Sequence, residues 1–229
     1  MDSIVSLCEP LTVIGGGVVF KGDIALSREF APRAVAADGG ADTALSAGVS
    51  LEAVIGDMDS ISNDARAKIP VERFHHIAEQ DSTDFEKVLR SVTAPLVIAV
   101  GFSGGRIDHE LATMHTLARR YHERIIVIAE HDIVFHCPRS LALSLPEGTR
   151  VSLFPMRPAT GRSKGLHWPI DGLKFAPAVQ SGTSNRATGD ISLEMDDPGM
   201  LCILPRDFIR QVVPALLALP EISRWPAPA

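Results

Sequence analysis

Two aspartates separated by one residue follow directly after an apolar run in the segment AVIGDMDS, residues 53–60. The apolar residues predict a short buried strand, and Gly56 allows the backbone to turn where that strand leaves its sheet. Asp57 and Asp59 repel each other at this spacing unless a cation lies between them, and Mg²⁺ with a phosphate partner is the usual solution. A solvated turn in which Ser60 caps the next helix is the structural alternative.

A second charged motif, QDSTDFEK at residues 80–87, predicts the start of a helix. Thr83 and Glu86 have the spacing of a capping box, which places Asp84 in the first helical turn. Lys87 follows three residues later and therefore lies on the same helix face. Such a pair suits a metal-bound polyphosphate, because the carboxylate can hold the cation while the ammonium contacts a phosphate oxygen. An ordinary ion pair at a helix start is the structural alternative.

Two further motifs also follow apolar runs. In GFSGGRIDH, residues 101–109, glycines free the backbone to wrap an anion at a helix N-terminus, and Arg106 adds a planar cation for phosphate. Asp108 lies within reach of a cation or a substrate amine. Asp38 and Gly39 end another apolar run, where paired glycines allow a ligand to approach closely. A helix cap is the alternative role of Asp38.

Strand and helix patterns alternate from residue 11 to about residue 129, and the strands are continuously apolar. This alternation predicts an α/β domain with a mostly parallel, Rossmann-like sheet between helices, and it gathers the motifs at the carboxyl ends of the strands. After about residue 135, short runs punctuated by Pro and Gly predict an antiparallel β domain. We place the domains at residues 1–137 and 138–229. The expected strands include Leu11–Phe20, Pro95–Gly101 and Leu173–Phe175.

The β domain carries two candidate ligand-binding features. The polar cluster Ser181–Asn185 can hydrogen-bond a ligand, and the indole of Trp168 suits a flat or cationic ligand. A turn and a core tryptophan are the structural alternatives.

Composition limits the partners and the compartment. A net charge of −6 in 229 residues argues against general binding to nucleic acid or to an anionic membrane. The three cysteines form neither a zinc pattern nor a disulfide framework, which suits a reducing compartment. No apolar run reaches transmembrane length and no signal-peptide pattern opens the chain. We therefore expect a cytoplasmic protein without nucleic-acid or membrane partners.

The ordered set of motifs resembles that of the thiamine pyrophosphokinase family: Asp-Gly-Gly-Ala at 38–41, Gly-Asp-x-Asp-Ser at 56–60, Asp-x-Thr-Asp-x-x-Lys at 81–87 and Gly-Gly-Arg-x-Asp-His at 104–109. Ser184-Asn185 in the C-terminal domain is similar to that family too. The resemblance implies a homodimer in which each chain has an α/β domain for nucleotide and Mg²⁺ and a β-sandwich for thiamine. It also implies transfer of the pyrophosphoryl group of ATP to the hydroxyl of thiamine, giving thiamine diphosphate and AMP.

The same resemblance implies roles for individual residues. Asp57, Asp59 and Asp84 would hold Mg²⁺ on the polyphosphate. Lys87 and Arg106 would neutralise phosphate oxygens. The remaining candidates would line the nucleotide or thiamine pocket: Asp38, Gly39, Gln80, Asp108, Trp168, Ser184 and Asn185. The sequence departs from the family pattern at Arg186-Ala187, where a more aromatic or acidic continuation is expected.

Three other functions compete with this interpretation. A Mg²⁺-dependent phosphohydrolase would need clustered aspartates but no domain for an acceptor. A non-catalytic nucleotide or thiamine-binding protein would be favoured by loss of the carboxylates, which are present. An NAD-dependent oxidoreductase is disfavoured because Gly15 and Gly17 lack the third glycine of the fingerprint, where Phe20 stands. AMP formation that requires thiamine separates the kinase from all three.

Overall fold

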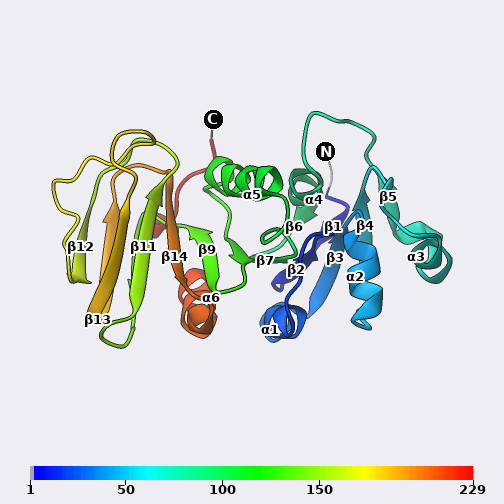
Figure 1. The fold of residues 1–229 in the computed structure, drawn as a ribbon, viewed down its shortest axis with the longest axis horizontal. Coiled ribbons are helices and arrows are strands. Elements are labelled where there is room, and N and C mark those ends of the chain that lie inside the picture. Colours follow the sequence, from blue (N-terminus) through cyan, green and yellow to red (C-terminus); the bar gives the residue numbers. More distant parts are fainter. Residues whose placement is uncertain (1–2, 229) are drawn as a thin grey trace. The chain divides into compact units, whose positions relative to one another are not determined.

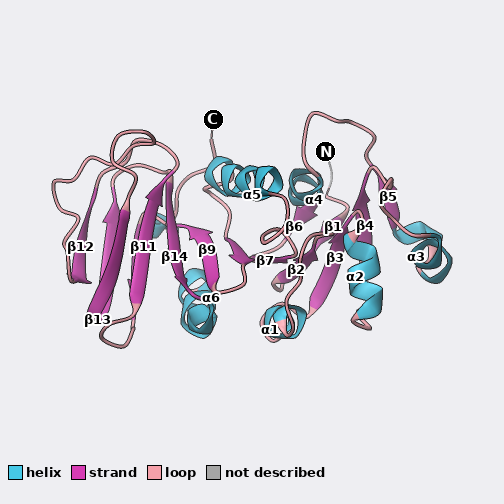
Figure 2. Cartoon of the chain, in the orientation of Figure 1, coloured by secondary structure: helices cyan, strands magenta, loops and turns pink. Residues whose placement is uncertain are grey.

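The computed structural model describes residues 3–228, and the chain divides into two compact units. The first unit runs to Thr113 and includes Val127–Glu130, while the second comprises Met114–Ile126 and the chain from His131 onward. Helices alternate with parallel strands in the first unit, and antiparallel strands dominate the second (Figure 1, Figure 2). The prediction of a mixed α/β fold is confirmed. Within residues 3–228, none of the helices has the length and apolar character needed to cross a bilayer.

The first unit is built on five parallel strands in the order β7–β2–β3–β4–β5, with β8 next to β7. Their bounds are β2 (Leu11–Ile14), β3 (Arg33–Ala37), β4 (Ala53–Gly56), β5 (Phe74–His76), β7 (Val97–Val100) and β8 (Ile125–Ile128). Every residue of β2, β4 and β7 is buried, which explains why these strands are apolar throughout instead of alternating.

Helices lie between successive strands along the chain: α1 (Asp23–Arg28), α2 (Gly40–Ser46), α3 (Asn63–Lys68), α4 (Asp84–Ser91) and α5 (Ile107–Arg119). Figure 1 shows α1 and α4 on opposite faces of the sheet; α1 packs on β2 and β7, and α4 on β3 and β4. The Ser62 hydroxyl caps α3, and the Thr83 hydroxyl accepts a hydrogen bond from the Glu86 amide at 3.3 Å, as the capping spacing predicts. A separate parallel pair joins β1 (Val5–Ser6) to β6 (Val92–Thr93).

The second unit centres on the long strand β13 (Thr183–Met195). Its first residues pair with β11, and its last residues pair with β10 and β12. Gly189, with φ of 132°, lies between the two parts, in a region that favours glycine. The strands and helix around it are β9 (Asp132–His136), β10 (Ser140–Leu143), β11 (Arg150–Pro155), β12 (Gly161–Leu166), β14 (Met200–Pro205) and α6 (Ile209–Leu217).

The first expected strand, Leu11–Phe20, is too long. The strand ends at Ile14 because the chain then passes against the backbone of Gly101. A Cβ atom on Gly15 or Gly17 would lie 2.6 Å from the Gly101 carbonyl oxygen, so both glycines permit this close approach. Two other expectations are also wrong in part: Leu173–Phe175 forms only an isolated bridge, and the Pro95–Gly101 strand is confined to Val97–Val100.

Candidate metal and phosphate site

A cleft of about 860 Å³ opens in the first unit, where the parallel strands end. Carboxyl ends of parallel strands are the usual ligand-binding edge of such sheets, and the predicted motifs meet there. Its lining includes residues from all four sequence motifs, among them Asp38, Gly39, Asp57, Asp59, Gln80, Asp84, Lys87, Gly105 and Arg106.

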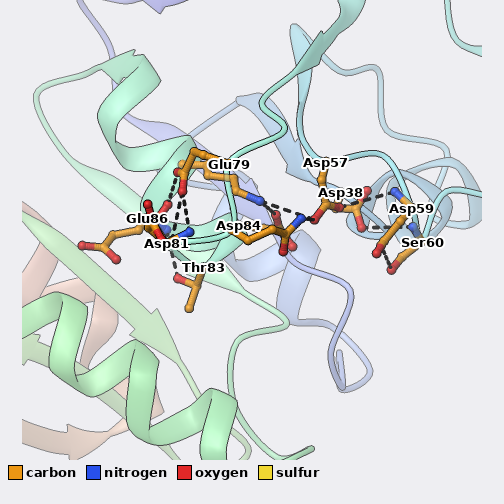
Figure 3. Close-up of polar contacts among 12 residues, drawn as sticks. Asp38, Asp57, Asp59, Ser60, Glu79, Asp81, Thr83, Asp84 and Glu86 are labelled. Carbon is orange, nitrogen blue, oxygen red and sulfur yellow. Dashed lines mark hydrogen bonds and ion pairs between the residues drawn. The ribbon is translucent and has the colours of Figure 1, made fainter.

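Three carboxylates, those of Asp38, Asp57 and Asp59, have oxygens within 4.8 Å of one another (Figure 3). Asp38 is only 3% exposed; its Oδ2 accepts a hydrogen bond from the Ser60 amide at 3.2 Å. Its buried Oδ1 has no hydrogen-bond partner within residues 3–228. A hard cation would satisfy this oxygen and offset the repulsion, so the three oxygen donors fit Mg²⁺.

The pKa of Asp38 is raised, chiefly because the carboxyl is buried and also because Asp84 and Asp57 are negative neighbours. The hydrogen bonds from Ser60 act in the opposite direction. The turn itself is strained, since Asp38 and Met58 adopt φ of 43° and 66°, a region unusual for residues that carry a Cβ. Both observations indicate that this turn has a local cost in folding stability.

The role of Gly56 in this turn differs from the predicted one, which is to allow a sharp change of backbone direction. Its φ is not positive; instead, a Cβ there would lie 2.9 Å from the Cβ of Asp38. The glycine therefore lets the ends of β3 and β4 approach, which brings Asp38 beside Asp57.

Lys87 links α4 to the end of β4. Its ammonium, only 2% exposed, lies 3.0 Å from Asp84 Oδ1 and 3.5 Å from Asp57 Oδ2. Burial lowers the pKa of Lys87, but the hydrogen bond and charge of Asp84, with Asp57, outweigh burial and raise it. Gln80 donates to Asp57 Oδ2 at 3.0 Å and is the largest cause of the lowered pKa of Asp57. The raised pKa thus keeps Lys87 charged where it lies between the carboxylates of Asp84 and Asp57.

The closest carboxylate cluster differs from the predicted metal set. Asp57 and Asp59 belong to both, but Asp38 is the third member in the structure, while Asp84 lines the same cleft and pairs with Lys87. The position of Asp38 at the end of β3, next to β4, is the signal that favours its inclusion. Sequence reasoning also missed Asp42, which lines the cleft and accepts hydrogen bonds from Ser62.

Arg106 lines the cleft with a side chain that is 72% exposed. Two hydrogen bonds join its guanidinium to Asp108, at 2.6 and 3.2 Å, and they lower the pKa of Asp108. In this structure, Asp108 is therefore paired with Arg106, two residues earlier in the chain.

The candidates in the second unit form a cluster of their own. Trp168 is 54% exposed, which excludes the alternative of a core tryptophan, and the Arg186 guanidinium lies 5.4 Å from its ring centre. Asn185 is buried and uses its amide on the backbone: its Oδ1 accepts from the amides of Trp168 (3.1 Å) and Arg186 (2.9 Å), and its Nδ2 donates to the Trp168 carbonyl (2.6 Å). Ser184 and Asn185 lie in β13, which excludes the turn alternative for these two residues.

Comparison with known proteins gives a consistent result. Residues 27–129, which contain all four motifs, match the family model described as "Thiamin pyrophosphokinase, catalytic domain". Thiamine pyrophosphokinase 1 of Oryza sativa subsp. japonica is 26% identical over 153 residues, 58% of either chain. Thiamine pyrophosphokinase 1 of Arabidopsis thaliana is 26% identical over 166 residues, 63% of this chain and 62% of its own. The chain thus matches less than two thirds of the length of these relatives.

Solved structures share the fold. Thiamin pyrophosphokinase from Geobacillus thermodenitrificans has a TM-score of 0.72 at 21% identity, over 86% of this chain and 96% of its own. The enzyme from Candida albicans has a TM-score of 0.73 at 17% identity, over 89% and 93%. Fold and cleft define an α/β protein whose strand ends carry an acidic site suited to a metal-bound phosphate. Residues 27–129 are similar to the catalytic domain of the thiamine pyrophosphokinase family, the family that the ordered motifs resemble.

Proposed function

We propose that this protein is a thiamine diphosphokinase, which transfers the pyrophosphoryl group of ATP to the hydroxyl of thiamine and releases AMP. The observation that carries the proposal is the cleft, where three clustered carboxylates lie beside a buried lysine and an exposed arginine. The family match over the segment that forms this cleft supports it.

Different residues of the cleft would bind different parts of a metal-bound polyphosphate. Asp57 and Asp59, with Asp38 and Asp84 beside them, would hold Mg²⁺, which when bound neutralises negative charge on the phosphate oxygens. Lys87 and Arg106 bind further phosphate oxygens as cations. Gly15, Gly17 and Gly101 let backbone approach closely where a side chain would collide. In-line attack at phosphorus needs such positioning and charge neutralisation more than covalent help.

The second unit supplies the candidate thiamine site in this proposal. The exposed indole of Trp168 offers a face for a flat, cationic ring, with Ser184 and Asn185 on the neighbouring strand. We further propose the Rossmann-like and β-sandwich domains at residues 1–137 and 138–229, assembly as a homodimer, and a cytoplasmic location.

Product analysis tests the proposal. The protein is incubated with ATP and Mg²⁺, with and without thiamine, and AMP, phosphate and thiamine diphosphate are measured by mass. Equal amounts of AMP and thiamine diphosphate, formed only with thiamine, are expected. Release of AMP or phosphate without thiamine would instead identify a phosphohydrolase.

A further inference from the structure

Glu79 is the centre of a compact network beside the cleft (Figure 3). Its Oε2 accepts hydrogen bonds from the amides of Asp81 (2.8 Å) and Ser82 (3.1 Å). Its Oε1 accepts from the Ser82 hydroxyl and from the Arg90 guanidinium. Arg90 also donates to the Ser82 hydroxyl at 2.9 Å, so the network closes on itself.

The ionised carboxylate is the form that this network requires. Four donors converge on Glu79, and only a carboxylate accepts from all of them without presenting a donor of its own. Ser82 and then Arg90 are the largest causes that lower the pKa of Glu79 to about 2. Glu79 is therefore charged at every pH of ordinary use.

The network holds a segment that has no regular structure. Residues 77–83 belong to neither a helix nor a strand, yet they join β5 to α4. Gln80, in this segment, donates to Asp57 in the cleft, and Arg90 anchors the segment to α4, which carries Asp84 and Lys87. The side chain of Glu79 itself is directed at Ser82 and Arg90.

We propose that Glu79 is a positioning residue: with Arg90 it fixes residues 80–83, so that Gln80 orients Asp57 in the cleft. The kinetic part of this inference rests on the proposed function, but its structural part does not. Loss of the carboxylate frees the segment, and Gln80 then leaves Asp57.

Hydrogen exchange on the metal-free protein tests the structural part. Glu79→Gln places an amide donor against the existing donors, so the Asp81 and Ser82 amides should exchange about tenfold faster or more. Glu72→Gln, the same change at an exposed glutamate of the same unit, should leave both rates unchanged. Unchanged exchange in Glu79→Gln would overturn the proposal. If that variant does not fold, Arg90→Gln should give the same signature, and its absence there counts equally against it.

A double-mutant cycle tests the connection to Gln80. Glu79→Gln and Gln80→Ala should each lower kcat for thiamine diphosphate formation by about tenfold, while KM for thiamine stays unchanged. The double variant should lose little beyond the larger single loss, because both changes act on Asp57. Fully additive losses would refute a route through Gln80. If the wild-type protein makes no thiamine diphosphate, the proposed function fails, whereas the exchange rates still decide the role of Glu79.

Discussion

The acidic cleft of the first unit and the Trp168 cluster of the second differ in how far their buried polar atoms are hydrogen-bonded. In the cleft, Asp38 keeps a buried oxygen without a partner in residues 3–228, and two more carboxylates face it. In the cluster, the amide of Asn185 is hydrogen-bonded to three backbone groups, and the Trp168 ring beside it is exposed. The cleft thus holds a buried carboxylate oxygen without a partner among the described residues, whereas the Asn185 amide in the cluster is hydrogen-bonded to backbone.

The largest effect should follow from Asp57→Asn, which removes the carboxylate shared by the cluster, Gln80 and Lys87. We expect transfer activity to fall at least about 1,000-fold, because charge neutralisation at phosphorus is lost. Steady-state kinetics measures the loss, and circular dichroism should show an unchanged fold. Full activity in this variant would remove Asp57 from the metal site.

Lys87→Met tests the electrostatic cost of the cleft. Removing the buried ammonium leaves Asp57 and Asp84 without their cation, so the free energy of unfolding without metal should fall by about 3 kcal/mol. Urea denaturation measures the change. The control is Lys68→Met, which breaks an exposed pair with Asp64 and should cost less than about 1 kcal/mol. Equal losses in the two variants would show that the cleft is not electrostatically strained.

His136 gives the second unit a pH dependence. Its Nε2 accepts the Gly199 amide, and burial lowers its pKa from 6.5 to about 4, so the unfolded chain binds the proton more readily. The contribution of His136 to the free energy of unfolding is therefore fully present above pH 6.5. It falls by about 3 kcal/mol as the pH decreases from 6.5 towards 4. In His136→Gln, which keeps an acceptor, unfolding between these pH values should lose that slope. An unchanged slope would assign the acid sensitivity to other groups.

Trp168 should contribute to binding more than to stability. Trp168→Ala should raise KM for thiamine about tenfold and leave the free energy of unfolding within about 0.5 kcal/mol. Trp225 is the matched control, because it is buried and its indole donates to the Cys137 carbonyl at 3.0 Å. Trp225→Ala should lower stability instead, and if KM responds equally to both changes, Trp168 has no special role.

Local patterns made much of the first unit predictable. The strand Arg33–Ala37, the Thr83 cap and the shared helix face of Asp84 and Lys87 all depend on neighbouring residues, and all three are confirmed. Parallel strand ends also brought the aspartates of different motifs to one edge.

Other features depend on contacts that no local pattern encodes. Asn185 holds the backbone of Trp168, 17 residues away, and only the pairing of the strands reveals this. The network around Glu79 depends on the path of an irregular segment, and the role of Gly56 depends on how closely β3 approaches β4. The position of Asp38 depends on the same kind of long-range contact. The sequence therefore predicts that Asp38 lines the site but does not predict that it joins the carboxylate cluster.

The fate of the β-phosphorus of ATP tests the central claim most directly. With ATP labelled at that phosphorus, Mg²⁺ and thiamine, the account predicts that the label leaves with the transferred group, giving labelled thiamine diphosphate and unlabelled AMP. Labelled ADP together with thiamine monophosphate, or labelled inorganic products without thiamine, would contradict it.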